Sequence, residues 1–269
     1  MECNQENKHK YKKDVLRLAI FAGELMLANG AETYRVEDSV VRICKSRGFH
    51  HINVFLTPNV IIISDERFDG YSFMKVIRHR CINLNKVDLL NDFSRRFVVN
   101  TDITIEEAIK ELKSLDDDIL YKPPYSKLAV NISTAIGSSS FAVLAGGDDL
   151  ITFMLTLITS VIAMLTYDKV MKISRISIFA TLVASIIISI AGVALTEIGI
   201  LETPKMLIVG SIMPLLPGVP FIKGIRDLIS GELVSGITRA FDAGMIATSI
   251  AAGVGMIINV YIKMGGTLY

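Results

Sequence analysis

The chain has 269 residues, of which 51% are hydrophobic, and its 28 basic and 27 acidic residues give a formal net charge of +1. This balance argues against nucleic-acid binding, because no basic excess is available to neutralise phosphates. Three cysteines without C-x-x-C spacing indicate neither a disulfide framework nor a zinc site, and we expect no metal and no cofactor.

The charged residues are concentrated in the first half of the chain. Residues 1–127 contain 20 basic and 19 acidic residues, whereas the remaining 142 contain eight of each. The first 14 residues are basic but lack the apolar core of a signal peptide. We therefore predict a cytoplasmic α+β domain at 1–125 and a transmembrane domain at 126–269, separated at the double proline 123–124.

The first half contains both helical and strand patterns. Apolar residues at helical spacing, with glycine at the end of the first two runs, predict helices. β-rich runs around Thr57-Pro58-Asn59 predict a small antiparallel sheet. Thr104 and Glu107 have the spacing of a capping box, which predicts a helix start. The expected helices are 12–29, 32–45, 85–98 and 104–115, and the expected strands are 52–56, 60–64 and 72–78.

A dense polar motif, GAETYRVED, occupies residues 30–38. Two interpretations are open: Arg35 lies three residues from both Glu32 and Asp38, which favours an internal ion-pair lattice, and the alternative is a ligand-recognition face. The motif residues in question are Glu32, Tyr34, Arg35, Glu37 and Asp38.

The second half contains five uncharged runs of about 17 to 21 residues, the length that a membrane-spanning helix needs. Basic residues cluster in the loops after the second and fourth runs, so the positive-inside bias predicts a cytoplasmic amino-terminal domain and an external carboxyl terminus. The expected spans are 127–145, 150–166, 176–196, 206–222 and 243–262, which form a five-helix bundle.

The fourth span is interrupted by prolines. Three prolines at three-residue spacing remove N–H groups and cannot all be absorbed as gentle kinks. Backbone freed in this way needs protein or a water-filled cavity around it, so a broken span is typical of a transport pathway, although a structural kink is the simpler alternative. The residues of this hypothetical pathway are Pro214, Pro217, Gly218, Pro220, Lys223, Arg226 and Asp227, together with Asp242 at the edge of the fifth span.

Hydroxyl-bearing residues repeat along several spans. Thr152, Thr156 and Ser160 recur every four residues on the second span, and Ser177, Thr181, Ser185 and Ser189 do so on the third. Such rows face other helices rather than lipid. Helix packing is the simpler explanation, and a polar route is the alternative.

Four stretches in order resemble the threonine/serine exporter family: FAGELMLANGAETYRVEDSVVRIC, NVFLTPNVIIIS, INLNKVDLLNDFSRR and MPLLPGVPFIKGIRDLISGE. The resemblance covers about residues 14–262. Within the family, the chain looks more specifically like the larger subunit of the two-component bacterial branch, which includes a succinate exporter. It implies a multi-pass inner-membrane secondary exporter of small hydroxy-amino acids or dicarboxylates that acts with a separate small membrane subunit, and a homo-oligomer is possible.

Within this hypothesis Lys223 or Arg226 attracts a substrate carboxylate, and Asp242 is the candidate for proton coupling. An interfacial ion pair of Asp242 with Arg239 or Arg226 is the alternative role for this residue. Two alternatives stay open: a membrane-anchored sensor or scaffold, and a membrane-bound hydrolase that uses the amino-terminal domain. The chain contains no G-x-S-x-G, Walker A or H-E-x-x-H motif, which disfavours an enzyme and ATP-driven pumping.

Overall fold

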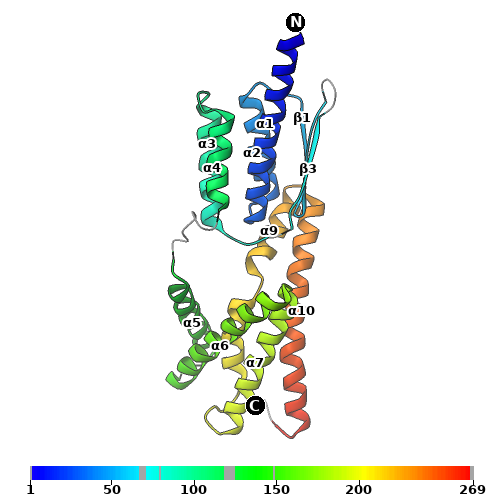
Figure 1. Cartoon of the computed structure of the whole chain (residues 1–269). Coiled ribbons are helices and arrows are strands. Elements are labelled where there is room, and N and C mark those ends of the chain that lie inside the picture. The colour runs from blue at the N-terminus through cyan, green and yellow to red at the C-terminus, as the bar shows by residue number, and fades with distance from the viewer. Residues whose placement is uncertain (1, 67–70, 79, 118–124, 148, 267–269) are drawn as a thin grey trace. The chain divides into compact units, whose positions relative to one another are not determined.

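The computed structural model describes residues 2–66, 71–78, 80–117, 125–147 and 149–266, with side chains from residue 9 onward. The chain forms two compact units (Figure 1). Unit 1 comprises Met1–Lys122 and Ile222–Ala240, and unit 2 comprises Pro123–Phe221 and Phe241–Tyr269. The stretch 222–240, which lies far along the second half of the sequence, therefore packs with the amino-terminal domain. The double proline at 123–124 lies outside the described residues.

Helix α1 (Glu2–Ala28) is the centre of unit 1. It packs against α2 (Thr33–Ser46), α3 (Leu84–Val99), α4 (Ile105–Asp116) and the sheet. Val15, Leu16, Leu18 and Ala19 are all completely buried, because α1 is contacted on several sides. A helix with a single apolar stripe would leave some of these consecutive positions exposed. The predicted start at residue 12 is wrong, because residues 2–11 are polar and extend the helix without an apolar pattern.

The predicted sheet is confirmed as three antiparallel strands in the order β1-β2-β3: Ile52–Thr57, Val60–Asp65 and Ser72–Val76. Thr57 pairs with Val60 across a two-residue turn, and the Thr57 hydroxyl accepts a hydrogen bond from the Val60 amide at 3.1 Å. Ile61 and Ile63 alternate with half-buried neighbours and face the core, as the period of a strand requires.

Helices α3 and α4 follow their predicted bounds to within a residue or two. The inward set Val87, Leu90, Phe93, Ser94 and Phe97 is buried. The capping box of α4 is present, since the Thr104 hydroxyl accepts from the Glu107 amide and the Glu107 carboxylate accepts from the Thr104 amide. These elements could be predicted because their signals are local.

Unit 2 consists of helices. They are α5 (Lys127–Leu144), α6 (Leu150–Ser174), α7 (Ser177–Glu197), α8 (Lys205–Ile212) with the 3-10 turn η1 (Met213–Leu215), the beginning of α9 (Gly218–Ile229) and most of α10 (Leu233–Lys263). Helix α10 begins ten residues before the predicted span at 243, because the same helix continues through the charged residues Arg239 and Asp242, which bound the uncharged run.

By length and apolar composition, three helices of the described chain are able to cross a membrane: α6, α7 and α10. Helices α8 and α9, with η1, pass the same test only together, as a pair interrupted between Leu215 and Gly218. Helix α5, predicted as the first span, does not pass, since Lys127, Asn131 and four serines dilute its apolar residues. The structure therefore confirms a mostly helical protein with three or four candidate spans and a small sheet near the amino terminus.

The predicted hydroxyl rows face other helices. Thr152, Thr156 and Ser160 on α6 are buried, as are Thr181, Ser185 and Ser189 on α7, whereas Ser177 at the start of α7 is only half-buried. Helices α5, α6, α7 and α8 pack against one another, and α10 meets α7 where Gly253 lies against Ser185. The apolar core between them is built from Ala163, Ala184, Ile188, Ile208, Leu215 and Ile250.

Candidate functional site

The candidate site is built on the short loop between α1 and α2. Two hydrogen bonds end α1, from the Gly30 amide to the Leu27 carbonyl (3.0 Å) and from the Ala31 amide to the Met26 carbonyl (2.9 Å), the pattern of a Schellman motif. Gly30 has a φ of +87°, and a side chain there would also lie 3.1 Å from the Cys81 carbonyl. Glycine is thus required for this turn, which leaves the Gly30 and Ala31 carbonyls available to other partners.

Helix α2 does not cap its own amino terminus. Glu32 occupies the N-cap position, but its side chain makes no capping hydrogen bond. The Thr33 amide instead donates to one oxygen of Asp227 (3.4 Å), and the Thr33 hydroxyl donates to the other (3.3 Å). A carboxylate at a helix amino terminus is stabilised by the exposed N–H groups and the helix dipole. Asp227 on α9 therefore supplies the anion that α2 lacks.

Arg239 on α10 neutralises this buried carboxylate. Its Nε lies 3.0 Å from Asp227 Oδ2, and its Nη2 donates to the Ala31 carbonyl at 3.0 Å. The Asp227 side chain is 0% exposed and that of Arg239 is 11% exposed. The low dielectric around this pair strengthens the attraction between its two charges. Removal of either partner would leave the other charge buried and uncompensated.

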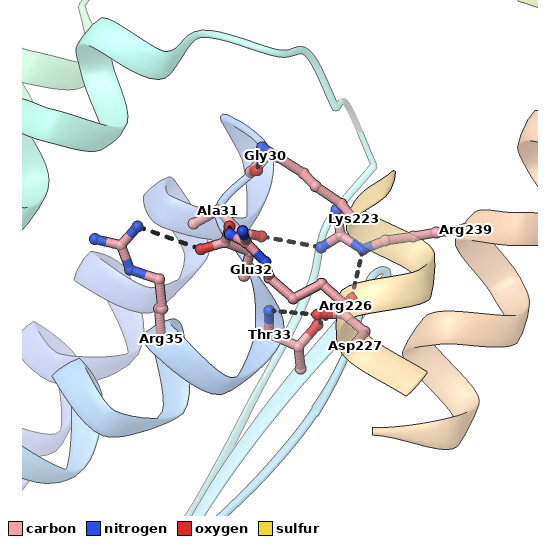
Figure 2. Close-up of polar contacts among 9 residues, drawn as sticks. All are labelled: Gly30, Ala31, Glu32, Thr33, Arg35, Lys223, Arg226, Asp227 and Arg239. Atoms are coloured by element: carbon pink, nitrogen blue, oxygen red, sulfur yellow. Dashed lines mark hydrogen bonds and ion pairs between the residues drawn. The ribbon is translucent and has the colours of Figure 1, made fainter. Parts of the chain in front are cut away.

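Two further cations of α9 contact the same loop (Figure 2). Lys223 donates to the Gly30 carbonyl, and Arg226 forms an ion pair with Glu32. Glu32 also pairs with Arg35 of its own helix, with 3.3 Å between Oε2 and Nη1. Lys223, Arg226 and Asp227 are spaced i, i+3 and i+4, so one face of α9 presents all three side chains to the loop.

Helices α9 and α10 approach each other closely enough to bring Asp227 and Arg239 together. A side chain on Gly224 would lie 3.0 Å from the Ala240 nitrogen and 3.1 Å from the Gly236 carbonyl, and one on Gly236 would lie 2.8 Å from the Gly224 carbonyl. These two glycines therefore allow the backbones of α9 and α10 to approach each other closely.

The nine residues of Figure 2, which we call the loop–α9 cluster, carry four basic and two acidic side chains. Burial disfavours the charged form of Glu32, but hydrogen bonds from Arg226 and Arg35 outweigh this and hold its pKa below the usual value. The cluster thus keeps both carboxylates engaged and has an excess of positive charge. Its Lys223 ammonium is bound to a neutral carbonyl, a partner that an anion is able to replace.

The GAETYRVED motif divides between this cluster and the surface. The predicted Glu32–Arg35 pair is present, whereas Asp38 pairs with Arg42 at 2.8 Å on the exposed side of α2. Tyr34 is exposed. Burial, followed by the negative charges of Glu232 and Asp38, raises the pKa of Glu37.

The predicted pathway residues extend through and beyond the break. Pro214 lies in η1, Pro217 lies between η1 and α9, and Pro220 lies in the first turn of α9, where a missing N–H costs little. Asp242 lies on α10 three residues after Arg239. Whether these residues line a pathway stays a prediction. In the part of the chain that the structure describes, no three His, Cys, Asp or Glu side chains come together as a metal site would require.

Thr33 and the Gly30 and Ala31 carbonyls were missed as members of the cluster, and Arg239 was considered only as a loop charge and a possible partner of Asp242. Their partners lie 193 to 208 residues away in the sequence. The only available signal was the i, i+3, i+4 spacing of Lys223, Arg226 and Asp227, which predicts a shared face but not what that face contacts.

Comparison with known proteins gives consistent matches over nearly the whole chain. The family described as "Putative threonine/serine exporter" matches residues 17–261. The chain is 23% identical to the "Probable succinate transporter subunit" of Klebsiella aerogenes, over 93% of this chain and 95% of that protein. It is 24% identical to the "Threonine/serine exporter" of Corynebacterium glutamicum, over 92% of this chain but only 51% of that protein, so it spans about half of that relative. No solved structure matches.

Proposed function

The chain belongs to the threonine/serine exporter family, and we propose that it is the larger subunit of a bacterial inner-membrane secondary exporter of small metabolites. Membership of an exporter family and several apolar helices make it a multi-pass membrane protein. The substrates we propose are the classes named for its relatives, hydroxy-amino acids of the threonine/serine type or a dicarboxylate such as succinate.

The observation that carries the proposal is the loop–α9 cluster. Helix α9 begins directly after the break at Leu216–Pro217, and its second and third turns carry Lys223, Arg226 and Asp227 to the GAET loop. A helix that leaves an interrupted span and binds a folded domain by ion pairs is suited to couple that domain to movements of the span. A scaffold or an anchor needs no such arrangement.

Within the proposal, the break at Pro214, Pro217, Gly218 and Pro220 opens the backbone beside the route. The cluster's excess cation then attracts the carboxylate that serine, threonine and succinate share. Lys223 is the more suitable of the two candidate cations, because its partner is a neutral carbonyl, whereas Arg226 is already paired with Glu32. Asp242 remains the candidate for proton coupling.

We further propose five crossings, with α5 as the first span and α8–α9 as the fourth, interrupted one. This count places unit 1 in the cytoplasm and the carboxyl terminus outside, in agreement with the positive loops at Lys169, Lys172 and Arg175. Two relatives are named as transporter subunits, which supports a separate membrane partner, and we propose that this partner is small. A homo-oligomer is compatible with the same proposal.

The proposal is tested by efflux from cells loaded with threonine and serine from peptides, or made to accumulate succinate. The full chain is expressed alone, with a small membrane subunit, and not at all. We expect efflux above background only when both subunits are present. If expression of both subunits increases the efflux of none of these solutes, the proposal is overturned. Arg226→Ala should abolish efflux with normal membrane insertion, whereas Arg42→Ala, which removes an exposed pair, should not change it.

A charge exchange separates two roles for Arg226. If Arg226 acts by holding Glu32, then the double variant Glu32→Arg, Arg226→Glu should restore efflux that either single variant loses. If Arg226 binds the substrate carboxylate directly, the exchange should restore nothing, because the cation has moved to α2.

A further inference from the structure

The three-stranded sheet of unit 1 has an outer face that points away from the core. Ile61 and Ile63 of β2 belong to the core, so the alternate positions of the same strand point outward. Directly paired residues share a face of a sheet. The register therefore places three rows on the outer face: Thr57, Val60 and Val76; Phe55, Ile62 and Met74; and Asn53, Ser64 and Ser72.

This outer face is apolar at its centre and carries no charge. None of the residues in the three rows is acidic or basic, although the first 127 residues of the chain contain 20 basic and 19 acidic residues. Phe55 is 57% exposed, Met74 is 63% exposed and Val76 is 50% exposed. Lys75, the charged residue of β3, lies on the other face and pairs with Glu24 of α1 at 3.0 Å. Exposed aromatic and methionine side chains without neighbouring charge indicate a contact surface.

The size of the outer face limits what can bind it. Three strands and about five residues per strand give a footprint of about 14 Å by 17 Å. That is about 240 Å², whereas a stable complex between freely diffusing proteins buries about 800 Å² on each partner. The face is therefore suited to a partner that is already confined to the same membrane, where the effective concentration is high. Other copies of this multi-pass chain meet that condition.

The absence of charge on the outer face also favours a second copy. Binding to anionic lipid headgroups uses lysine and arginine, and the three rows contain neither. A two-fold axis brings the same face of both copies together, so any charge on that face would meet its own sign. A neutral face meets a copy of itself without this repulsion.

We infer that the outer face of the sheet joins two copies of this chain face to face, with Ile62 close to the two-fold axis. Stacked sheets lie about 10 Å apart, and their facing side chains interdigitate. Ile62 is the middle residue of the middle row, because it pairs with Phe55 on one side and Met74 on the other. The inference goes beyond the proposed function, since it does not depend on which solute is exported.

The test is cross-linking of Ile62→Cys in membranes of cells that express the full chain with its membrane partner. Cys3→Ser and Cys81→Ser remove other thiols from the background, and Cys44 is kept because it is buried. We expect a bismaleimide that spans about 10 Å, the separation of stacked sheets, to give a product of twice the mass of the chain. The control is Val99→Cys on α3, which is 84% exposed and should give no such product.

A second substitution tests the chemistry of the face. Met74→Glu, added to the Ile62→Cys chain, places a charge between the two sheets and should reduce the cross-linked fraction at least tenfold. Met74→Leu keeps the face apolar and should leave the cross-linked fraction unchanged. Because Met74 is exposed in the single chain, both variants should have the Tm of the parent chain in detergent, which separates loss of contact from unfolding.

Three results overturn the inference. They are a product from Ile62→Cys no more abundant than that from Val99→Cys, an unchanged cross-linked fraction in the Met74→Glu variant, and a product whose mass is that of the chain plus a different protein. The last result assigns the face to that protein, the membrane partner included. Efflux is not part of the measurement, so each of these results leaves the proposed function standing.

Discussion

Asp227→Asn tests whether the loop–α9 cluster stabilises unit 1. The substitution keeps the size of the side chain and an oxygen for the Thr33 amide, but it leaves the buried Arg239 charge without its carboxylate. Breaking a buried pair in this way costs about 3–5 kcal/mol. Because Arg239 keeps its bond to the Ala31 carbonyl, we expect the lower end, about 3 kcal/mol.

The measurement is thermal unfolding of the full chain in detergent, together with hydrogen exchange of the first amides of α2. For a unit of this size about 3 kcal/mol lowers Tm by about 6–12 °C. The matched control is Asp38→Asn, which removes the exposed i, i+4 ion pair between Asp38 and Arg42 on α2. This substitution should cost about 0.5 kcal/mol or less. If Asp227→Asn unfolds at the same temperature as Asp38→Asn, Asp227 does not stabilise α2 in the way described.

Three further outcomes follow from the site. The pKa of Glu37 is raised in the folded chain, so the ionisation of Glu37 lowers the free energy of unfolding once the pH rises above the ordinary pKa of a glutamate. Glu37→Gln should therefore increase Tm at pH 7, and the increase should vanish below about pH 4. Gly224→Ala should lower Tm, because its side chain would lie 3.0 Å from the α10 backbone, whereas Gly244→Ala, with open space around it, should leave Tm equal or higher. Cys44 is buried and its pKa is raised to about 12, mainly by burial and further by Asp65, so maleimide at pH 7 should label exposed Cys81 and not Cys44 in the folded chain.

The elements that the sequence predicts well are those whose signals are local. The capping box at Thr104 and Glu107, the two-residue turn after Thr57 and the inward face of α3 each involve residues within one or two turns of one another. The early start of α1 was missed because polar residues extend a helix without changing its periodicity. The start of α10 was missed for a different reason: Arg239 and Asp242 end the uncharged run, but the helix itself continues through them to Leu233.

The candidate site could be predicted only as two separate halves. Glu32 and Arg35 were identified on one side, and Lys223, Arg226 and Asp227 on the other. Neither sequence window shows that Glu32 fails to cap α2, because a glutamate before a helix is also compatible with an ordinary first turn. Because Glu32 does not cap α2, the Thr33 amide is available to donate to Asp227. This hydrogen bond joins residues nearly 200 positions apart in the sequence.

The long-range cap also changes how the amino-terminal domain should be defined. A fragment of residues 1–122 would lack 222–240, so the first turn of α2 would lose its acceptor and the carbonyls of Gly30 and Ala31 would lose the Lys223 and Arg239 donors. Any movement that draws α9 away from the loop must break these same contacts. The stability of α2 and the position of α9 are therefore thermodynamically linked: a ligand that favours the docked position of α9 also stabilises α2, and the coupling free energy is the same in both directions.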